Sequence, residues 1–165
     1  MVRSLLLGTT LLVASVFHPL DASQRFVCPT TASAKPPQFF APPPYSANAP
    51  FHHSFWYGTE ALWTMLRRDG HWGGLYLGDT REYRNKVLIW RKGYDLRTEQ
   101  RPALTLTAVR LDAPASPILV HEATNASGED IGSVMLTSAN LPAEGCWELT
   151  AHYGPEMLTF VVSVP

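Results

Sequence analysis

Residues 145–164 read GCWELTAHYGPEMLTFVVSV, and this stretch decides the fold of the chain. Apolar and polar residues alternate from 146 to 153, which is the pattern of a half-buried β-strand. Gly154-Pro155 is a turn signal, and a second apolar run follows it at 158–164. The stretch therefore predicts a β-hairpin.

The first strand of this hairpin has two chemically different faces, because successive side chains of a strand point to opposite sides. One face carries Trp147, Leu149, Ala151 and Tyr153, and the other carries Cys146, Glu148, Thr150 and His152. We interpret the first set as the core face. Cys146 is then expected to point outward.

Upstream of the hairpin, from Phe55 onward, short apolar runs alternate with turn residues at intervals of roughly 8 to 15. This spacing predicts an all-β fold, an immunoglobulin-like β-sandwich of about seven to eight strands. The expected strands are 62–66, 74–77, 86–90, 103–111, 118–121 and 133–136. We expect a hairpin turn at Arg68-Asp69-Gly70 to join the first two, and a polar loop at 124–132.

The composition limits the class of protein. The chain has 165 residues, of which 45% are apolar and 16% charged, with a net charge of -1. This is enough for one domain, and it fits neither a disordered chain nor a basic nucleic-acid-binding protein. We expect a signal peptide at 1–23, a proline-rich extended arm at 24–53 and a β-sandwich domain at 54–165.

The N-terminal sequence predicts export. A basic residue, Arg3, precedes an apolar run at 4–17, and small residues follow near Ala22-Ser23, as in a secretory signal peptide. The run is shorter than the roughly 20 residues of a membrane span, so no span is expected in the mature protein. The six prolines of 34–50 indicate an extended arm rather than a packed element. The protein is expected to be secreted, periplasmic or extracellular.

The sequence has two cysteines, Cys28 and Cys146. In an oxidising compartment they are expected to form a disulfide. The bond would close a loop of about 118 residues and hold the arm across the outside of the sandwich.

Several motifs resemble a family of small secreted bacterial proteins to which no function is attached. The motifs are Cys28-Pro29-Thr30, Tyr57-Gly58 with Ala61-Leu62-Trp63-Thr64, Arg110-Leu111-Asp112-Ala113-Pro114, and Gly145-Cys146-Trp147-Glu148-Leu149-Thr150 with Leu158-Thr159-Phe160-Val161. The chain departs from the family pattern at Gly58-Thr59, where Gly-Asn is expected. Its ending also resembles the final hairpin of immunoglobulin-like bacterial modules, a signal for the fold alone.

Two catalytic or metal-binding alternatives remain open. The sequence lacks the common nucleophile, phosphate-loop and zinc motifs, but His121 and Glu122 could join a distant partner in a metal-dependent or hydrolytic enzyme. Cys146, His152 and Met157 have a spacing close to that of a copper loop, with His71 or His121 as a further ligand. A disulfide at Cys146 would remove the thiol. Since the copper loop would then lack its thiol and the common zinc motifs are absent, we expect no cofactor.

The segment 51–57 concentrates aromatic and imidazole groups directly after the arm. It predicts either a platform for stacking a sugar or a peptide, made of Trp56, His52 and His53, or a cap on the core with solvated histidines. If Phe55 and Tyr57 face the core, Trp56 is expected to be exposed. The sequence as a whole favours a secreted, non-catalytic binding or structural module of the cell envelope, with an unknown protein or glycan partner.

Overall fold

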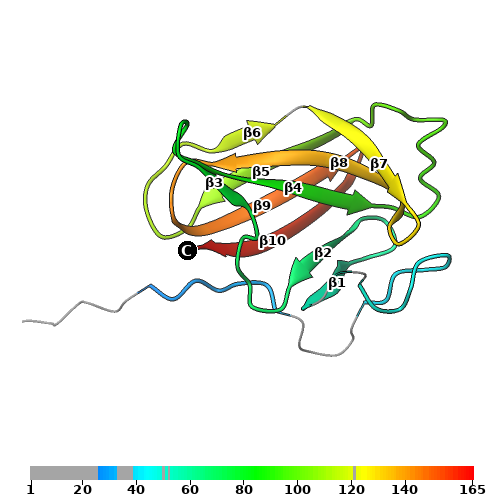
Figure 1. Ribbon diagram of the computed structural model, residues 1–165, viewed down its shortest axis with the longest axis horizontal. Coiled ribbons are helices and arrows are strands. Elements are labelled where there is room, and N and C mark those ends of the chain that lie inside the picture. Colours follow the sequence, from blue (N-terminus) through cyan, green and yellow to red (C-terminus); the bar gives the residue numbers. More distant parts are fainter. Residues whose placement is uncertain (1–25, 33–38, 50, 52, 121) are drawn as a thin grey trace, which may run out of the picture.

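Two antiparallel sheets make up the fold (Figure 1). The computed structural model describes residues 26–32, 39–49, 51, 53–120 and 122–165. The six-stranded sheet has the order β1 (Ser54–Gly58), β2 (Trp63–Arg67), β4 (Glu82–Trp90), β8 (Gly132–Leu141) and β7 (Ala123–Gly128), and β3 (Leu75–Leu77) also pairs with β4. The four-stranded sheet has the order β10 (Glu156–Val164), β9 (Gly145–Tyr153), β5 (Leu104–Arg110) and β6 (Ile118–Val120).

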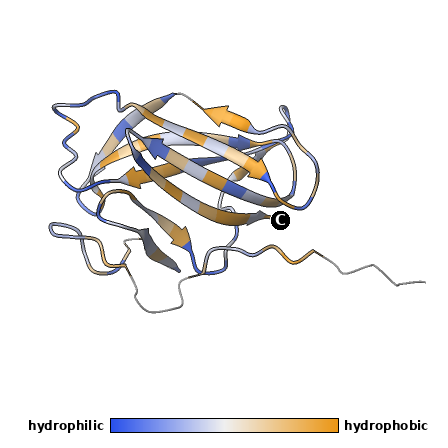
Figure 2. Cartoon of the chain, turned by 180° about the vertical axis from the view of Figure 1, so that it is seen from behind, coloured by the Kyte–Doolittle hydropathy of each residue, from blue (hydrophilic) through white to orange (hydrophobic). Residues whose placement is uncertain are grey.

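The prediction of an all-β sandwich is confirmed, although the described residues form ten strands rather than seven to eight. The C-terminal hairpin is confirmed as well, since β9 and β10 pair from Tyr153↔Glu156 to Gly145↔Val164. Hydrophobic and hydrophilic residues alternate along the long strands (Figure 2). The alternation allows each sheet to bury one face against the other.

The main core lies between the two sheets. Trp147 and Leu149 of β9 are fully buried there, together with Ile89 of β4 and Phe160 of β10. Trp147, Leu149 and Ala151 form the buried side of β9, as the alternation predicted, and Tyr153 is partly buried beside them.

The expected polar loop at 124–132 is wrong, because most of it belongs to β7. This strand pairs along β8, with Asn125 opposite Met135. It lies at the edge of its sheet and is mostly exposed or half-buried. Small polar residues are compatible with such a strand, but they give no hydrophobic signal in the sequence.

The expected hairpin between 62–66 and 74–77 is also wrong. β2 and β3 do not pair with each other but lie one after the other along β4, at Thr64↔Ile89 and Leu75↔Arg84. The connecting residues cross to the other sheet, where His71 forms a bridge with Ser163 of β10. A Cβ on Gly74 would lie 2.3 Å from the carbonyl oxygen of Arg84, so glycine permits this close approach to β4.

A second, smaller core lies on the outer side of the six-stranded sheet. Residues from β1, β2, β4 and β8 pack there against part of the proline-rich arm: Trp56, Trp63, Trp90 and Val134 from the sheet, and Phe39, Ala41, Tyr45 and Ala49 from the arm. The expectation that the arm does not pack is therefore wrong for 39–49. An extended segment without regular structure can still cover apolar surface when its aromatic residues reach a sheet.

Trp56 belongs to this second core, and the prediction that it is exposed is wrong. Its side chain is 3% exposed, and its indole Nε1 donates a hydrogen bond of 2.9 Å to the carbonyl oxygen of Ser46. Phe55 is buried on the opposite side of β1, in the main core. The alternation placed the two residues on opposite faces correctly, but both faces are covered.

Replacing Trp56 by phenylalanine should lower the free energy of unfolding by about 1–3 kcal/mol. The change removes the hydrogen bond to Ser46 and leaves a void beside Trp90, whose ring centroid lies 5.0 Å from that of Trp56. Urea denaturation measures the difference. Phe51→Leu is the control, since Phe51 is exposed in the same segment and should change stability by under about 0.5 kcal/mol. Equal stability of the Trp56 variant and the parent protein would contradict the second core.

None of the described residues forms a helix long and apolar enough to cross a membrane.

Candidate functional site

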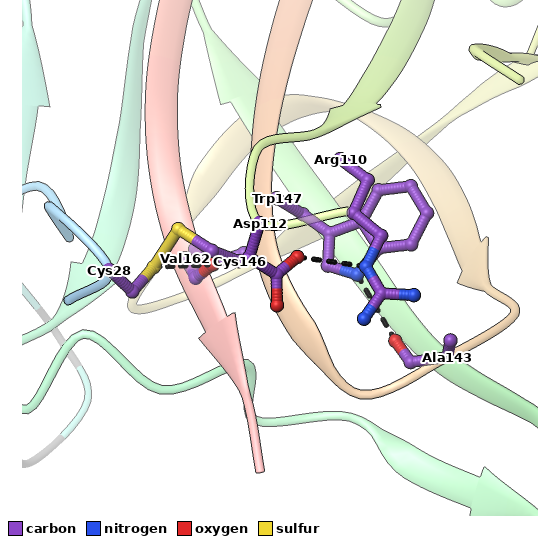
Figure 3. Close-up of polar contacts among 7 residues, drawn as sticks. All are labelled: Cys28, Arg110, Asp112, Ala143, Cys146, Trp147 and Val162. Atoms are coloured by element: carbon purple, nitrogen blue, oxygen red, sulfur yellow. Dashed lines mark hydrogen bonds and ion pairs between the residues drawn. A yellow bond between two sulfur atoms is a disulfide. The ribbon is translucent and has the colours of Figure 1, made fainter. Parts of the chain in front are cut away.

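The disulfide between Cys28 and Cys146 is confirmed (Figure 3). It joins the arm to the beginning of β9, and its Cα atoms are 5.4 Å apart. Cys146 lies on the side of β9 opposite Trp147, as the alternation predicted, yet it is buried. The arm accounts for part of this burial, because the Cys28 sulfur is bonded to that of Cys146 and lies 3.6 Å from the carbonyl oxygen of Val162.

Backbone contacts extend this attachment along β10. The amide of Thr31 donates to the carbonyl oxygen of Val161, and the amide of Val161 donates to Thr31 Oγ1 at 2.8 Å. Further along β10, Ser163 exchanges hydrogen bonds with Gly70 and Trp72. The edge of β10 is therefore protected against pairing with another chain over this part of its length.

A charged pair stands beside the disulfide. Arg110 Nε donates to Asp112 Oδ1 at 2.8 Å, and both side chains of this pair are partly exposed (Figure 3). The bond from Arg110 is the main reason why the pKa of Asp112 is lowered, and a hydrogen bond from the Cys146 amide adds to it. Gly145 has a φ of 129°, and a Cβ there would lie 2.5 Å from Asp112 Oδ2. The carboxylate thus requires glycine at this position.

Trp147, the neighbour of Cys146 in β9, fixes the turn between β8 and β9. Trp147 Nε1 donates to the carbonyl oxygen of Ala143 at 3.1 Å (Figure 3). The turn residues are thereby held next to Arg110, at one end of the sandwich.

A shallow hollow of about 350 Å³ opens at this end and is the candidate functional site. It is lined by Tyr76, Arg81, Tyr83, Arg110, Pro142, Ala143 and Glu144. The two tyrosines are brought together by the pairing of β3 with β4, in which Tyr76 lies opposite Tyr83. Their ring centroids are 4.9 Å apart and their planes are inclined by 45°. Tyr76 is 56% exposed.

Polar groups stand around the two rings. The Tyr83 hydroxyl donates to Glu144 Oε1 at 2.9 Å. Partial desolvation of Tyr83 and this carboxylate raise the pKa of the phenol. A tyrosine hydroxyl is neutral at pH 7 without any such shift, so it is available as a hydrogen-bond donor. Arg81 and Arg110 supply guanidinium donors, and Arg110 is held in place by Asp112. The hollow can therefore stack a flat, partly apolar ring and hydrogen-bond its hydroxyl groups.

The residues predicted for ligand binding do not lie in this hollow. Trp56 is in the second core, and His53 is exposed beside the start of β1. His52 lies outside the described residues, as does His121 of the predicted hydrolytic alternative. Glu122 is exposed, and its carbonyl oxygen accepts a hydrogen bond from Thr137 Oγ1.

The predicted copper ligand set is wrong, because the Cys146 thiol is consumed by the disulfide. His152 and the exposed Met157 do face each other across the hairpin, but Cys146 lies six residues from His152 along β9, about 20 Å away. Within the part of the chain that the structure describes, no three His, Cys, Asp or Glu residues are grouped as a metal site would require.

Sequence reasoning missed the two tyrosines of the hollow. The signal available was weak, namely two tyrosines on either side of the Gly78-Asp79-Thr80 turn. Their meeting depends on the register of β3 on β4, which the sequence pattern does not fix.

A comparison with known protein families finds no matching family model, and neither a search of curated proteins nor one of solved structures finds a match.

Proposed function

We propose that this protein is a secreted, non-catalytic binding module of the cell envelope that binds a glycan in the hollow around Tyr76 and Tyr83. The aromatic pair at the surface carries the proposal, with Tyr76 56% exposed and Tyr83 half-buried beside it. Sugar rings present apolar C–H faces that stack on aromatic side chains, and their hydroxyl groups take up neighbouring donors and acceptors. Glu144, Arg81 and Arg110 supply such groups around the two rings.

Three features support the location. The N-terminal sequence has the pattern of a signal peptide. The disulfide suits an oxidising compartment such as the periplasm or the extracellular space. No helix among the described residues could span a membrane.

The shape of the hollow favours a polymer over a small metabolite. It is open and shallow, and the aromatic pair lies at its surface rather than at the bottom of a deep cleft. Such a surface contacts one side of a chain of sugars and leaves both ends of the chain free to continue. Insoluble envelope and structural polysaccharides are therefore suitable probes.

Replacing Tyr76 by alanine should reduce retention of the mature protein on a binding polysaccharide at least tenfold. The change removes the more exposed of the two tyrosine rings on which a sugar would stack. Cosedimentation with peptidoglycan, chitin and cellulose measures the retention. Tyr83→Phe should give a smaller loss, since only the hydroxyl bonded to Glu144 disappears. Melting temperatures should stay within a few degrees of the parent protein's.

Leu75→Ala is the matched control. Leu75 precedes Tyr76 in β3, is 75% exposed and points to the other side of the strand. An equal loss of retention in this variant, or retention on none of the three polysaccharides, would contradict the proposal. Retention that survives Tyr76→Ala would place glycan binding elsewhere on the protein.

A further inference from the structure

A gap in the six-stranded sheet lies between β2 and β4. β2 pairs with β4 only at Trp63↔Trp90 and Thr64↔Ile89. Pairing along this side of β4 resumes at Leu75↔Arg84, after the chain has crossed to β10 and back. Among the described strands, none pairs with 85–88 on this side, although β8 pairs with them on the other.

A slot of about 80 Å³ occupies this gap, and we call it the β2–β4 slot. It is lined by Thr64, Met65, Leu66, Arg67, His71, Trp72, Gly73, Asn85, Lys86, Val87, Leu88, Phe160 and Val162. The lining includes both inward and outward residues of the same strands, such as the buried Val87 and the exposed Lys86. The slot therefore passes through the sheet from its outer surface into the main core.

The inner part of the slot is apolar. Leu66 and Val87 of one sheet face Phe160 and Val162 of the other. Trp72, from the segment between β2 and β3, also lines the slot. The Trp72 indole is fixed by a hydrogen bond from Nε1 to the carbonyl oxygen of Tyr83. Apolar cavities of this kind bind apolar groups, and a cavity of about 150 Å³ accepts a benzene ring. By that proportion the slot has room for roughly three carbon atoms.

The outer end of the slot is basic. Lys86, Arg67 and His71 belong to its lining, and none of the described residues that line it is acidic. Arg67 is paired with Asp69, so Lys86 contributes the charge most readily available to a ligand. An anionic group at the outer end would be attracted by Lys86, while an alkyl group would fit the inner part.

We infer that the β2–β4 slot binds a small amphiphilic anion, namely a short-chain aliphatic carboxylate, with its alkyl group between Trp72 and Phe160 and its carboxylate beside Lys86. This site is separate from the hollow around Tyr76 and Tyr83, and its occupancy does not depend on glycan binding.

Titration of the isotopically labelled mature protein with butanoate, followed by NMR, tests the inference. Amide shifts should concentrate at 64–67, 71–73 and 85–88, with a dissociation constant on the order of 1 mM for so small a ligand. Butanol, which has the chain without the charge, and acetate, which has the charge without the chain, should each bind more weakly. No saturable shift at these residues, or equal shifts with acetate, would overturn the inference.

Two variants test the two ends of the slot separately. Lys86→Gln should weaken butanoate binding roughly two- to fivefold, the range of an exposed ion pair, and leave butanol binding unchanged. Lys92→Gln makes the same change of net charge at a lysine outside the slot and should have no effect. Equal effects of the two lysine variants would overturn the assignment of the carboxylate.

Val87→Leu adds a methylene to the slot and should abolish binding of butanoate and butanol alike. If Val87→Leu does not fold, Val162→Ile is the test in its place, because it fills the slot from the opposite sheet. Unchanged butanoate binding in a folded variant of either kind would show that the ligand lies elsewhere.

Discussion

Replacing Trp147 by alanine is expected to lower the free energy of unfolding by about 3–5 kcal/mol, the usual cost of truncating a large buried aromatic side chain. Trp147 is fully buried in the main core. Its Nε1 also donates to the carbonyl oxygen of Ala143, so the substitution leaves that turn without its anchor. For a domain of this size a loss of 3–5 kcal/mol is a large share of the total stability.

Glu148→Ala is the control for this prediction. Glu148 follows Trp147 in β9 but lies on the other face and is only half-buried. We expect a change under about 0.5 kcal/mol. Urea denaturation of both variants compares the two faces of one strand directly. A larger loss for Glu148→Ala than for Trp147→Ala would mean that the register of β9 is shifted by one residue.

Replacing Cys28 and Cys146 together by alanine is expected to cost about 2–5 kcal/mol. The bond closes a sequence separation of 118 residues, for which chain entropy alone accounts for roughly 4–5 kcal/mol. The loss should also loosen the arm along β10. Hydrogen exchange at the Val161 amide, which donates to Thr31, should therefore become faster in the variant.

Thr31→Val is the matched control, because it removes the hydroxyl that accepts from Val161 and keeps the disulfide. It should cost about 1 kcal/mol. Mass spectrometry of the purified protein without reducing agent should find no free thiol. Two alkylatable cysteines, or a double variant as stable as the parent protein, would contradict the attachment of the arm.

Prediction of strands and buried faces from the sequence was most accurate where the residues of one strand alternate clearly between apolar and polar. In 146–153 the alternation of apolar and polar residues is unbroken, so it predicted both the strand and the buried face that holds Trp147 and Leu149. β7 was missed for the opposite reason. Its residues are small and polar, and β8 supplies the partner that makes it a strand.

The candidate site was predicted poorly, because its parts depend on contacts between distant segments. The alternation correctly put Phe55 and Trp56 on opposite sides of β1, but it could not tell that the arm covers Trp56. Tyr76 and Tyr83 approach each other only through the register of β3 on β4.

The sequence by itself determined the all-β class, the C-terminal hairpin, the buried face of β9 and the partners of the disulfide. These follow from side-chain alternation, turn residues and a cysteine count of two, which are local or compositional properties. Only the tertiary structure decided that the arm covers the outer side of β1, that two tyrosines meet at one end of the sandwich, and that the crossing of residues 68–74 to β10 opens a slot beside β4. The physical reason is that alternation shows which side chains share a face, whereas burial depends on what other part of the chain packs against that face.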